Sequence, residues 1–204
     1  TRVQVEETLT RLREDNVENV LAARGYQPDL PRRMDFLHAS DLAKAIAQTG
    51  GFGVAGACYP EGHVESPSLK ADVESLRYKA EAGVSHLITQ LFFDNVSYYR
   101  FLNMARKAGI LCPCRLVLCH REQKADRAHR ALSSASLPPQ FTKMISRYDH
   151  DEQALFDAGI EYAVTQIRDL ITGGADGIHL YAMNNARVAR LVYEGIRDLL
   201  PERT

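Results

Sequence analysis

Tyr59-Pro60-Glu61-Gly62-His63 stands one residue after the apolar run from Phe52 to Ala57, and a helical pattern follows it. A short apolar run bounded by turn residues is typical of a buried strand. A second motif, Ile88-Thr89-Gln90-Leu91-Phe92-Phe93-Asp94, ends another such run in the same way. Both motifs therefore belong to loops at the carboxyl ends of strands, where a β/α barrel keeps its chemistry.

Each motif has a plainer alternative. A Tyr-Pro-Glu turn is also ordinary loop punctuation. The second motif is harder to explain in that way, because Gln90 and Asp94 flank an aromatic pair. Gln90 offers both a donor and an acceptor to a planar heterocycle, which an apolar strand end does not need for its own structure.

Composition narrows the class of protein. The 204 residues are 45% hydrophobic and 25% charged, with a net charge of -1, as in a soluble domain with a sizeable core. The absence of a basic patch argues against nucleic acid, and no apolar run approaches the roughly 18 residues of a membrane span. We expect a cytoplasmic protein.

The first residues, Thr1 to Glu7, read as the middle of a helix rather than a signal peptide, so we expect the chain to start inside a longer protein.

The rest of the chain alternates strands with helices, which predicts a parallel sheet. The expected strands are Asn19 to Ala23, Phe52 to Ala57, His86 to Gln90, Cys114 to Leu118 and Gly177 to Tyr181. A first helix is expected to end at Glu14. Further helices are expected over Ser40 to Gln48, Ser68 to Ala82 and Val96 to Ala108, and within Pro139 to Thr172. A final helix is expected to reach Leu200. Gly25, Gly83, Gly109 and Gly174 mark element ends. A closed barrel has eight βα units in typically about 250 residues. We count five units here, so the predicted fold is α/β, a single partial (β/α)8 TIM barrel domain over residues 1–204.

The chain resembles the flavin-dependent methylenetetrahydrofolate reductases. Besides the two motifs, the resemblance rests on segments in the family's order: Asn19 to Gly25, His38 to Leu42, Gly159 to Ala163 and Gly177 to Tyr181. It runs from about Asn16 to Leu200 and is broken only around Arg115 to Arg130. The resemblance implies an oxidoreductase of one-carbon metabolism and methionine biosynthesis. Reduced FAD would pass a hydride to 5,10-methylenetetrahydrofolate and give 5-methyltetrahydrofolate, with a reduced nicotinamide or another electron donor.

The resemblance also implies site residues. Flavin contacts are expected from Arg24, Gly25, His38, Ala39, Tyr59, His63, Asp72, Ser75 and Lys79. Asp72 matches a ribose contact and Lys79 a flavin or phosphate contact, whereas Gln90 and Tyr181 match the folate side. Asp72, Ser75 and Lys79 share one helix face by their spacing. A solvated charged face is the alternative interpretation of these three residues.

Two departures from the family bear on activity. Tyr26 stands where the family usually has Asp, with Asp29 only nearby. Loss of a carboxylate beside the flavin should make its reduction easier, because reduced flavin gains negative charge. The resemblance places the missing units at the N-terminal side, together with the family's acidic residue that assists protonation of the folate. Open sheet edges would then favour association, so a homo-oligomer is a further expectation.

The region after Cys112 needs a separate interpretation. Cys112, Cys114 and Cys119 cluster with His120, but the spacing matches no familiar zinc pattern, so reduced thiols are expected rather than a metal site. Permitted codons for Arg115 to His120 read two bases later as Ala-Gly-Ile-Met-Pro, which is like a loop of the family. His120 to Arg130 can likewise be read one base later. We hypothesise compensating frame changes, which sequencing of the gene would test.

Two other classes of function stay open. One is an inactive remnant, truncated or frameshifted, that binds flavin poorly. The other is an interaction module built on the partial barrel, for which the sequence gives no positive signal.

Overall fold

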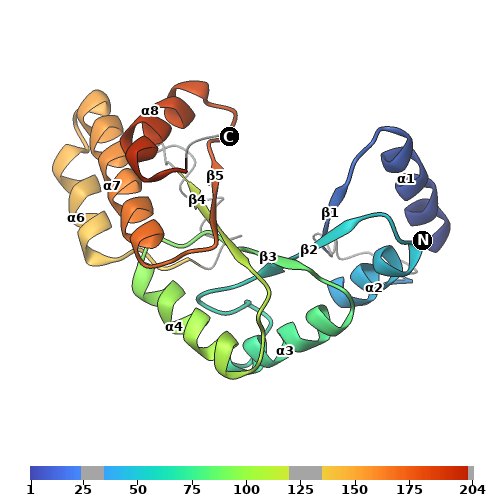
Figure 1. Cartoon of the computed structure of the whole chain (residues 1–204). Helices are drawn as coiled ribbons and strands as arrows, with labels where there is room; N and C mark the ends of the chain where they lie inside the picture. Colours follow the sequence, from blue (N-terminus) through green and yellow to red (C-terminus); the bar gives the residue numbers. More distant parts are fainter. Residues whose placement is uncertain (24–34, 120–134, 202–204) are drawn as a thin grey trace.

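The structure is a computed structural model, and it describes residues 1–23, 35–119 and 135–201. Strands and helices alternate along most of the chain (Figure 1). With the labels of Figure 1, the described elements are α1 (Arg2–Glu14), β1 (Asn19–Ala22), α2 (Ala39–Thr49), β2 (Gly53–Cys58), α3 (Leu69–Glu81), β3 (His86–Thr89), α4 (Asn95–Lys107), β4 (Cys114–Cys119), α6 (Pro139–Tyr148), α7 (Glu152–Thr172), β5 (Gly177–Tyr181), α8 (Ala186–Ile196) and the 3-10 turn η2 (Arg197–Leu199).

The strands form one parallel sheet in sequence order, β1-β2-β3-β4-β5. Its register places Leu21 beside Ala55, Ala55 beside His86, and Ile88 beside Arg115. Parallel neighbours need a crossover, which the intervening helices supply. The carboxyl ends of all five strands therefore meet at one edge. The predicted α/β fold with a parallel sheet is confirmed.

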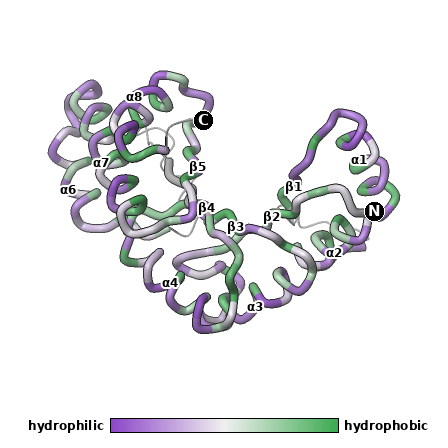
Figure 2. The backbone as a smooth tube through the Cα atoms, in the orientation of Figure 1, coloured by the Kyte–Doolittle hydropathy of each residue, from purple (hydrophilic) through white to green (hydrophobic). Residues whose placement is uncertain are grey.

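The two faces of the sheet differ in what covers them. Val54, Cys58 and Leu87 point toward the helices and are at most 3% exposed. Figure 2 shows the chain coloured by hydropathy, with hydrophobic and hydrophilic residues alternating along the helices. The helices lie along the convex outside of the curved sheet, and among the described residues none covers the concave inner face (Figure 1). Leu21, which faces inward from β1, is consequently 48% exposed.

The helices begin and end at residues suited to those positions. The N-cap side chains of Ser68, Asp94, Asp151 and Asn185 each accept a hydrogen bond from a backbone N–H in the first turn of their helix. Glycines with positive φ stand just past three helix ends: Gly83 at 98°, Gly109 at 79° and Gly174 at 81°. These glycines confirm the predicted stop signals, because the left-handed conformation costs glycine little. Gly25 lies outside the described residues.

Element boundaries differ from the sequence prediction by a residue or two in most places. β2 is shifted one residue later and takes in Cys58, and the stretch from Pro139 to Thr172 divides into two helices. The predicted final helix ends at Ile196 rather than Leu200, and a 3-10 turn follows. In that turn Asp198 accepts two hydrogen bonds, at 2.6 and 2.8 Å, from Arg168 of α7. The chain ahead of Pro201 is thus drawn back onto α7. That the sheet is five units of an eight-unit barrel in a single domain stays a prediction.

Candidate functional site

The loop after β2 is an ordered turn. Gly62 has a φ of 92°, and its N–H donates to the carbonyl of Tyr59 at 3.0 Å. Glycine adopts this backbone conformation without the steric cost that a side chain would add. Pro60 is among the most deeply buried residues, below 2% exposed. The loop is therefore part of the folded core rather than a free connection.

The carboxylate of Asp72, on α3, is hydrogen-bonded to this loop. The carboxylate is 5% exposed. Its Oδ2 accepts the N–H of His63 at 3.2 Å, and its Oδ1 accepts the hydroxyl of Ser66 at 3.1 Å. The alternative of a solvated face is therefore wrong for Asp72. The solvated face of α3 carries the Lys70–Glu74 pair instead, with side chains 80% and 61% exposed.

Lys79 and Ser75 lie on the same face of α3 as Asp72. Lys79 Nζ donates to the carbonyl of Ala57 at 2.6 Å and lies 5.8 Å from the ring centroid of Tyr59. Burial lowers the pKa of Lys79, and the charge of Asp72 opposes that shift. Ser75 Oγ donates to the carbonyl of Asp72 at 2.7 Å. An ammonium has three N–H donors, and among the described residues Lys79 uses one, which leaves two for a ligand.

Tyr59 and His63 are in contact across the turn. Their ring centroids are 4.6 Å apart with an interplanar angle of 82°, an edge-on arrangement. The backbone N–H of Glu65 donates to His63 Nδ1 at 3.1 Å. A ring nitrogen that accepts cannot carry a proton, so the neutral imidazole has its N–H at Nε2. His63 therefore offers a hydrogen-bond donor.

Gln90 follows β3 directly beside this loop. Its backbone N–H donates to the carbonyl of Cys58 at 2.6 Å, and its Oε1 accepts the N–H of Leu91 at 2.8 Å. Because a backbone donor faces the side chain, the oxygen must occupy that position and the amide orientation is fixed. The Nε2 group has no partner among the described residues. Gln90 therefore presents an unused donor, and its Oε1 keeps a second lone pair, so that it offers both to a planar heterocycle stays a prediction.

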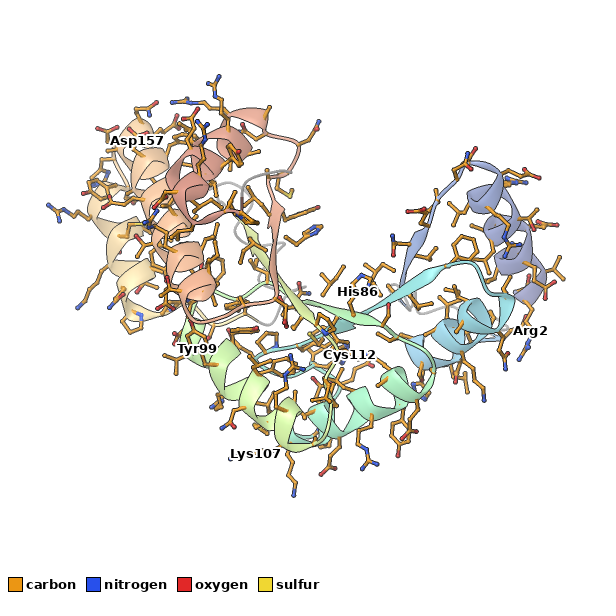
Figure 3. All side chains as sticks on the ribbon, viewed as in Figure 1. Arg2, His86, Tyr99, Lys107, Cys112 and Asp157 are labelled. Carbon is orange, nitrogen blue, oxygen red and sulfur yellow. The ribbon has the colours of Figure 1, made fainter. Side chains whose placement is uncertain are left out.

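Tyr181 ends β5 on the inner face. It pairs in register with Cys119 and is 48% exposed. The loop that follows contains two residues with positive φ, Met183 at 48° and Asn184 at 60°. Such conformations are uncommon outside glycine and cluster at functional loops. Figure 3 places His86, near the amino end of β3, on the same inner side of the sheet.

The remaining predicted flavin contacts divide into two groups. His38 and Ala39 lie at the start of α2, where Asp41 Oδ2 accepts the N–H groups of Leu37 and His38 at 3.1 and 2.9 Å. Arg24 and Gly25 lie outside the described residues, as do Tyr26 and Asp29. The structure brings Tyr59, His63, Asp72, Ser75 and Lys79 together, with Gln90 adjacent. His38 and Ala39 belong to the start of α2 and Tyr181 to the end of β5, on other elements than the cluster.

The cysteines take different partners. Cys58 Sγ and Cys114 Sγ lie 3.6 Å apart in the core, and burial raises the pKa of the Cys58 thiol. Cys112 Sγ donates to the carbonyl of Val84 at 3.4 Å. All three are free thiols. In the part of the chain that the structure describes, no group of three His, Cys, Asp or Glu could hold a metal ion. The side chain of Cys119 and all of His120 lie outside it.

Sequence reasoning missed two long-range contacts of these loops. Glu61 Oε2 accepts the N–H of Ser136 at 2.8 Å, while its Oε1 is buried with no partner among the described residues. Tyr162 donates to the carbonyl of Phe93 at 2.7 Å. Partners 75 and 69 residues apart leave no local pattern. For Tyr162, its place in the Gly159 to Ala163 motif was the only signal.

An open groove of about 900 Å³ lies between α4, α6 and α7, on the outer side of the sheet. Its walls carry charges of both signs, including Lys143, Arg147, Glu161 and Asp169. This groove is separate from the cluster around Tyr59. Among the described helices, none has the length and apolar character needed to cross a membrane.

The fold defines a class: a parallel β/α protein, in which polar side chains of the described loops gather at the carboxyl ends of the strands. A family model described as methylenetetrahydrofolate reductase matches residues 1–197. The chain therefore belongs to the methylenetetrahydrofolate reductase family.

Named relatives agree with that assignment. The 5,10-methylenetetrahydrofolate reductase of Pectobacterium carotovorum is 29% identical over 192 residues, covering 93% of this chain and 63% of that protein. The protein of the same name from Escherichia coli is 29% identical over 178 residues, covering 86% and 59%. A probable methylenetetrahydrofolate reductase (NADPH) of Caenorhabditis elegans is 30% identical over 189 residues, covering 88% and 28%. The chain thus spans about three fifths of the bacterial relatives.

A solved structure shares the fold. An uncharacterised protein from Clostridium thermocellum, described as binding two copies of 5-methyl-5,6,7,8-tetrahydrofolic acid, superposes with a TM-score of 0.55 at 13% identity. The match covers 80% of this chain and 59% of that one.

Proposed function

We propose that the chain is part of a flavoprotein that reduces 5,10-methylenetetrahydrofolate to 5-methyltetrahydrofolate with FAD. The observation that carries the proposal is the cluster of Tyr59, His63 and Lys79 at the edge where Gln90 also stands. Gln90 is joined to that cluster by its backbone hydrogen bond to Cys58, the residue before Tyr59. The reaction is inferred from family membership, and the cluster is the proposed site for it.

The residues present fit a flavin dinucleotide. Lys79 has two N–H donors free for phosphate or flavin oxygens, and His63 offers Nε2–H. Tyr59 adds an aromatic surface beside both. When bound, FAD would supply the hydride chemistry, while the protein binds and orients. Asp72 would act mainly by holding the loop, since its buried carboxylate already accepts two hydrogen bonds. For Asp72 to contact the ribose as well, one of its carboxylate oxygens would have to be accessible to the ligand.

Gln90 and Tyr181 are the proposed folate contacts. Gln90 Nε2 would donate to an acceptor on the pterin, and Tyr181 would line the same edge. The Clostridium thermocellum protein of similar fold, described as binding 5-methyltetrahydrofolic acid, supports a folate as ligand. The electron donor would be a reduced nicotinamide, as the name of the Caenorhabditis elegans relative indicates for that protein.

The sheet would be part of an eight-unit barrel. The described strands are all parallel and consecutive, and the described helices lie on one face, with none of them over the inner face. Three more βα units between β5 and β1 would close such a barrel.

The second candidate is an inactive remnant of the same enzyme. Tyr26, which stands where the family usually has Asp, favours it.

Flavin binding separates the two candidates. Protein purified and mixed with FAD, then freed of excess by gel filtration, should keep a flavin absorbance band. Lys79→Met should lose most of it, whereas Lys44→Met, which changes an exposed lysine of α2, should not. Flavin absent from all three proteins would support the remnant, and equal retention by all three would contradict the assigned site.

A further inference from the structure

The motif Gly159 to Ala163 has no assigned task in the proposed reaction, yet its tyrosine contacts the loop after β3. The Tyr162 hydroxyl donates to the carbonyl of Phe93 at 2.7 Å. One turn further along α7, Gln166 Nε2 donates to the carbonyl of Phe92 at 3.3 Å. Two consecutive carbonyls of one loop are therefore held by one face of one helix.

Other contacts fix the far end of the same loop to α7. Asn95 Nδ2 donates to the carbonyl of Gln166 at 3.0 Å and to Asp169 Oδ2 at 2.7 Å. The ring of Phe141 lies 4.6 Å from that of Phe93 and 5.0 Å from that of Tyr162. Phe93 is 3% exposed, so the loop is anchored in the protein at this end.

The N-terminal end of the same loop, at Leu91, determines how the side-chain amide of Gln90 is oriented. The Gln90 side chain is held by the N–H of Leu91, and Leu91 immediately precedes the anchored pair Phe92 and Phe93. Peptide units are rigid planes, so a rotation at Phe92 or Phe93 is passed to the N–H of Leu91 through few soft dihedrals. The orientation of the Gln90 amide thus depends on how firmly α7 holds the two carbonyls.

We propose that Tyr162 is a positioning residue, which holds the loop after β3 so that Gln90 Nε2 is aimed at the folate. The folate as ligand rests on the proposed function, whereas the positioning itself rests on the contacts. Burial raises the pKa of Tyr162, and the nearby charge of Asp94 adds to the shift, so the hydroxyl stays protonated and can donate.

Hydrogen exchange on the chain itself tests the positioning without any ligand. Tyr162→Phe keeps the ring against Phe141 and removes only the hydroxyl. Tyr193→Phe is the matched control, because it makes the same chemical change at an exposed site of α8. One hydrogen bond corresponds to about a 2- to 10-fold change. We expect Tyr162→Phe to lower protection of the Leu91 amide by about that factor relative to the amides of β2, and Tyr193→Phe to leave this ratio unchanged.

Ligand binding gives the second measurement. Titration of 5-methyltetrahydrofolate onto FAD-loaded protein, extended at the N-terminus with the βα units of a relative, should show a Kd raised about 2- to 10-fold by Tyr162→Phe, with FAD affinity unchanged. In a Gln90→Ala background the same change should have little further effect, because Tyr162 acts through Gln90.

Three results would overturn the proposal. They are equal loss of Leu91 protection in the Tyr162 and Tyr193 variants, parallel loss of FAD and folate affinity, and additive effects of the Tyr162 and Gln90 substitutions. Failure of the parent protein to bind folate would count against the proposed function instead, and hydrogen exchange would still decide the positioning role.

Discussion

Gln90 is held by two backbone groups and still has a free donor, which makes it the residue on which ligand choice depends. We expect Gln90→Ala to weaken folate binding about tenfold, or roughly 1.4 kcal/mol, and to leave flavin content near normal. The measurement is folate affinity and turnover in a form extended at the N-terminus with the βα units of a relative.

The control for this substitution is Gln48→Ala, which removes an exposed glutamine of α2. It should change neither ligand. Equal loss of flavin and of folate turnover on Gln90→Ala would show that Gln90 serves the cofactor rather than the substrate.

Tyr99 joins α4 to α7 through Asp169, donating to its carbonyl at 3.1 Å and to its Oδ2 at 2.9 Å. Burial, and then the hydrogen bond to Asp169, raises the pKa of Tyr99 from 10.0 to about 12. The unfolded phenol loses its proton first as the pH rises. The stabilisation is therefore complete below about pH 10 and is lost as the pH approaches 12.

We expect Tyr99→Phe to be less stable than the parent at neutral pH, by about 1 kcal/mol for the lost hydrogen bond. The difference should shrink between pH 10 and 12, because only the parent has this group to deprotonate. Urea unfolding across that range measures it, with Tyr193→Phe at an exposed site as the control. A difference that grows with pH would have the wrong sign for this account.

Residues also show where sequence reasoning succeeds and where it stops. Asp72, Ser75 and Lys79 could be placed on one face because helix spacing is local. That Asp72 is buried and holds the loop at His63 depended on how α3 packs, which no spacing reveals. The Gln90 orientation was missed for a similar reason, because the N–H of Leu91 competes for its oxygen.

At the scale of elements, α7 is the support for the loop after β3, so its N-terminal cap matters to the site. Asp151 Oδ1 accepts the N–H groups of Gln153 and Ala154 at 3.1 and 2.9 Å. We expect Asp151→Ala to cost about 1 kcal/mol, or about 2–4 °C in Tm. Asp151→Asn should cost much less, since Asn caps nearly as well. Thermal unfolding of the three proteins is the measurement, and equal losses in both variants would mean that charge rather than capping is what Asp151 supplies.

Elements were predicted well where local signals exist. The stops at Gly83, Gly109 and Gly174 needed only the conformational freedom of glycine, and the structure has all three. The division between α6 and α7 was less visible, because both segments are amphipathic and only Asp151 marks the second start. Two sheet neighbours, β4 and β5, lie more than fifty residues apart in sequence, and their pairing followed from alternation alone.

At the scale of the whole molecule, the described sheet has two edge strands, β1 and β5, which lie far apart in Figure 1. In a preparation of these 204 residues alone, unpaired edges and a half-exposed inner face would favour association between chains. The sequence predicted these open edges, because it contains five βα units whereas a closed barrel has eight. What it could not give is how much apolar surface the inner face leaves open, because Ala55 there is 3% exposed while Leu21 is 48% exposed.

The final prediction is that the 204-residue chain, expressed alone, is not a competent reductase. An eight-unit barrel that keeps five units loses three-eighths of its units and the packing that they provide. The net free energy of unfolding of a domain is only about 5 to 15 kcal/mol. Burial contributes roughly 25 cal/mol per Å², so the open inner face removes a large share of the energy that would hold Gln90 and Tyr181 in place. The assay supplies purified chain with FAD, methylenetetrahydrofolate and a reduced nicotinamide, beside the N-terminally extended form. Only the extended form should turn over. Turnover by the short chain on the order of 1 per second or more would mean that five units hold the ligands as well as eight.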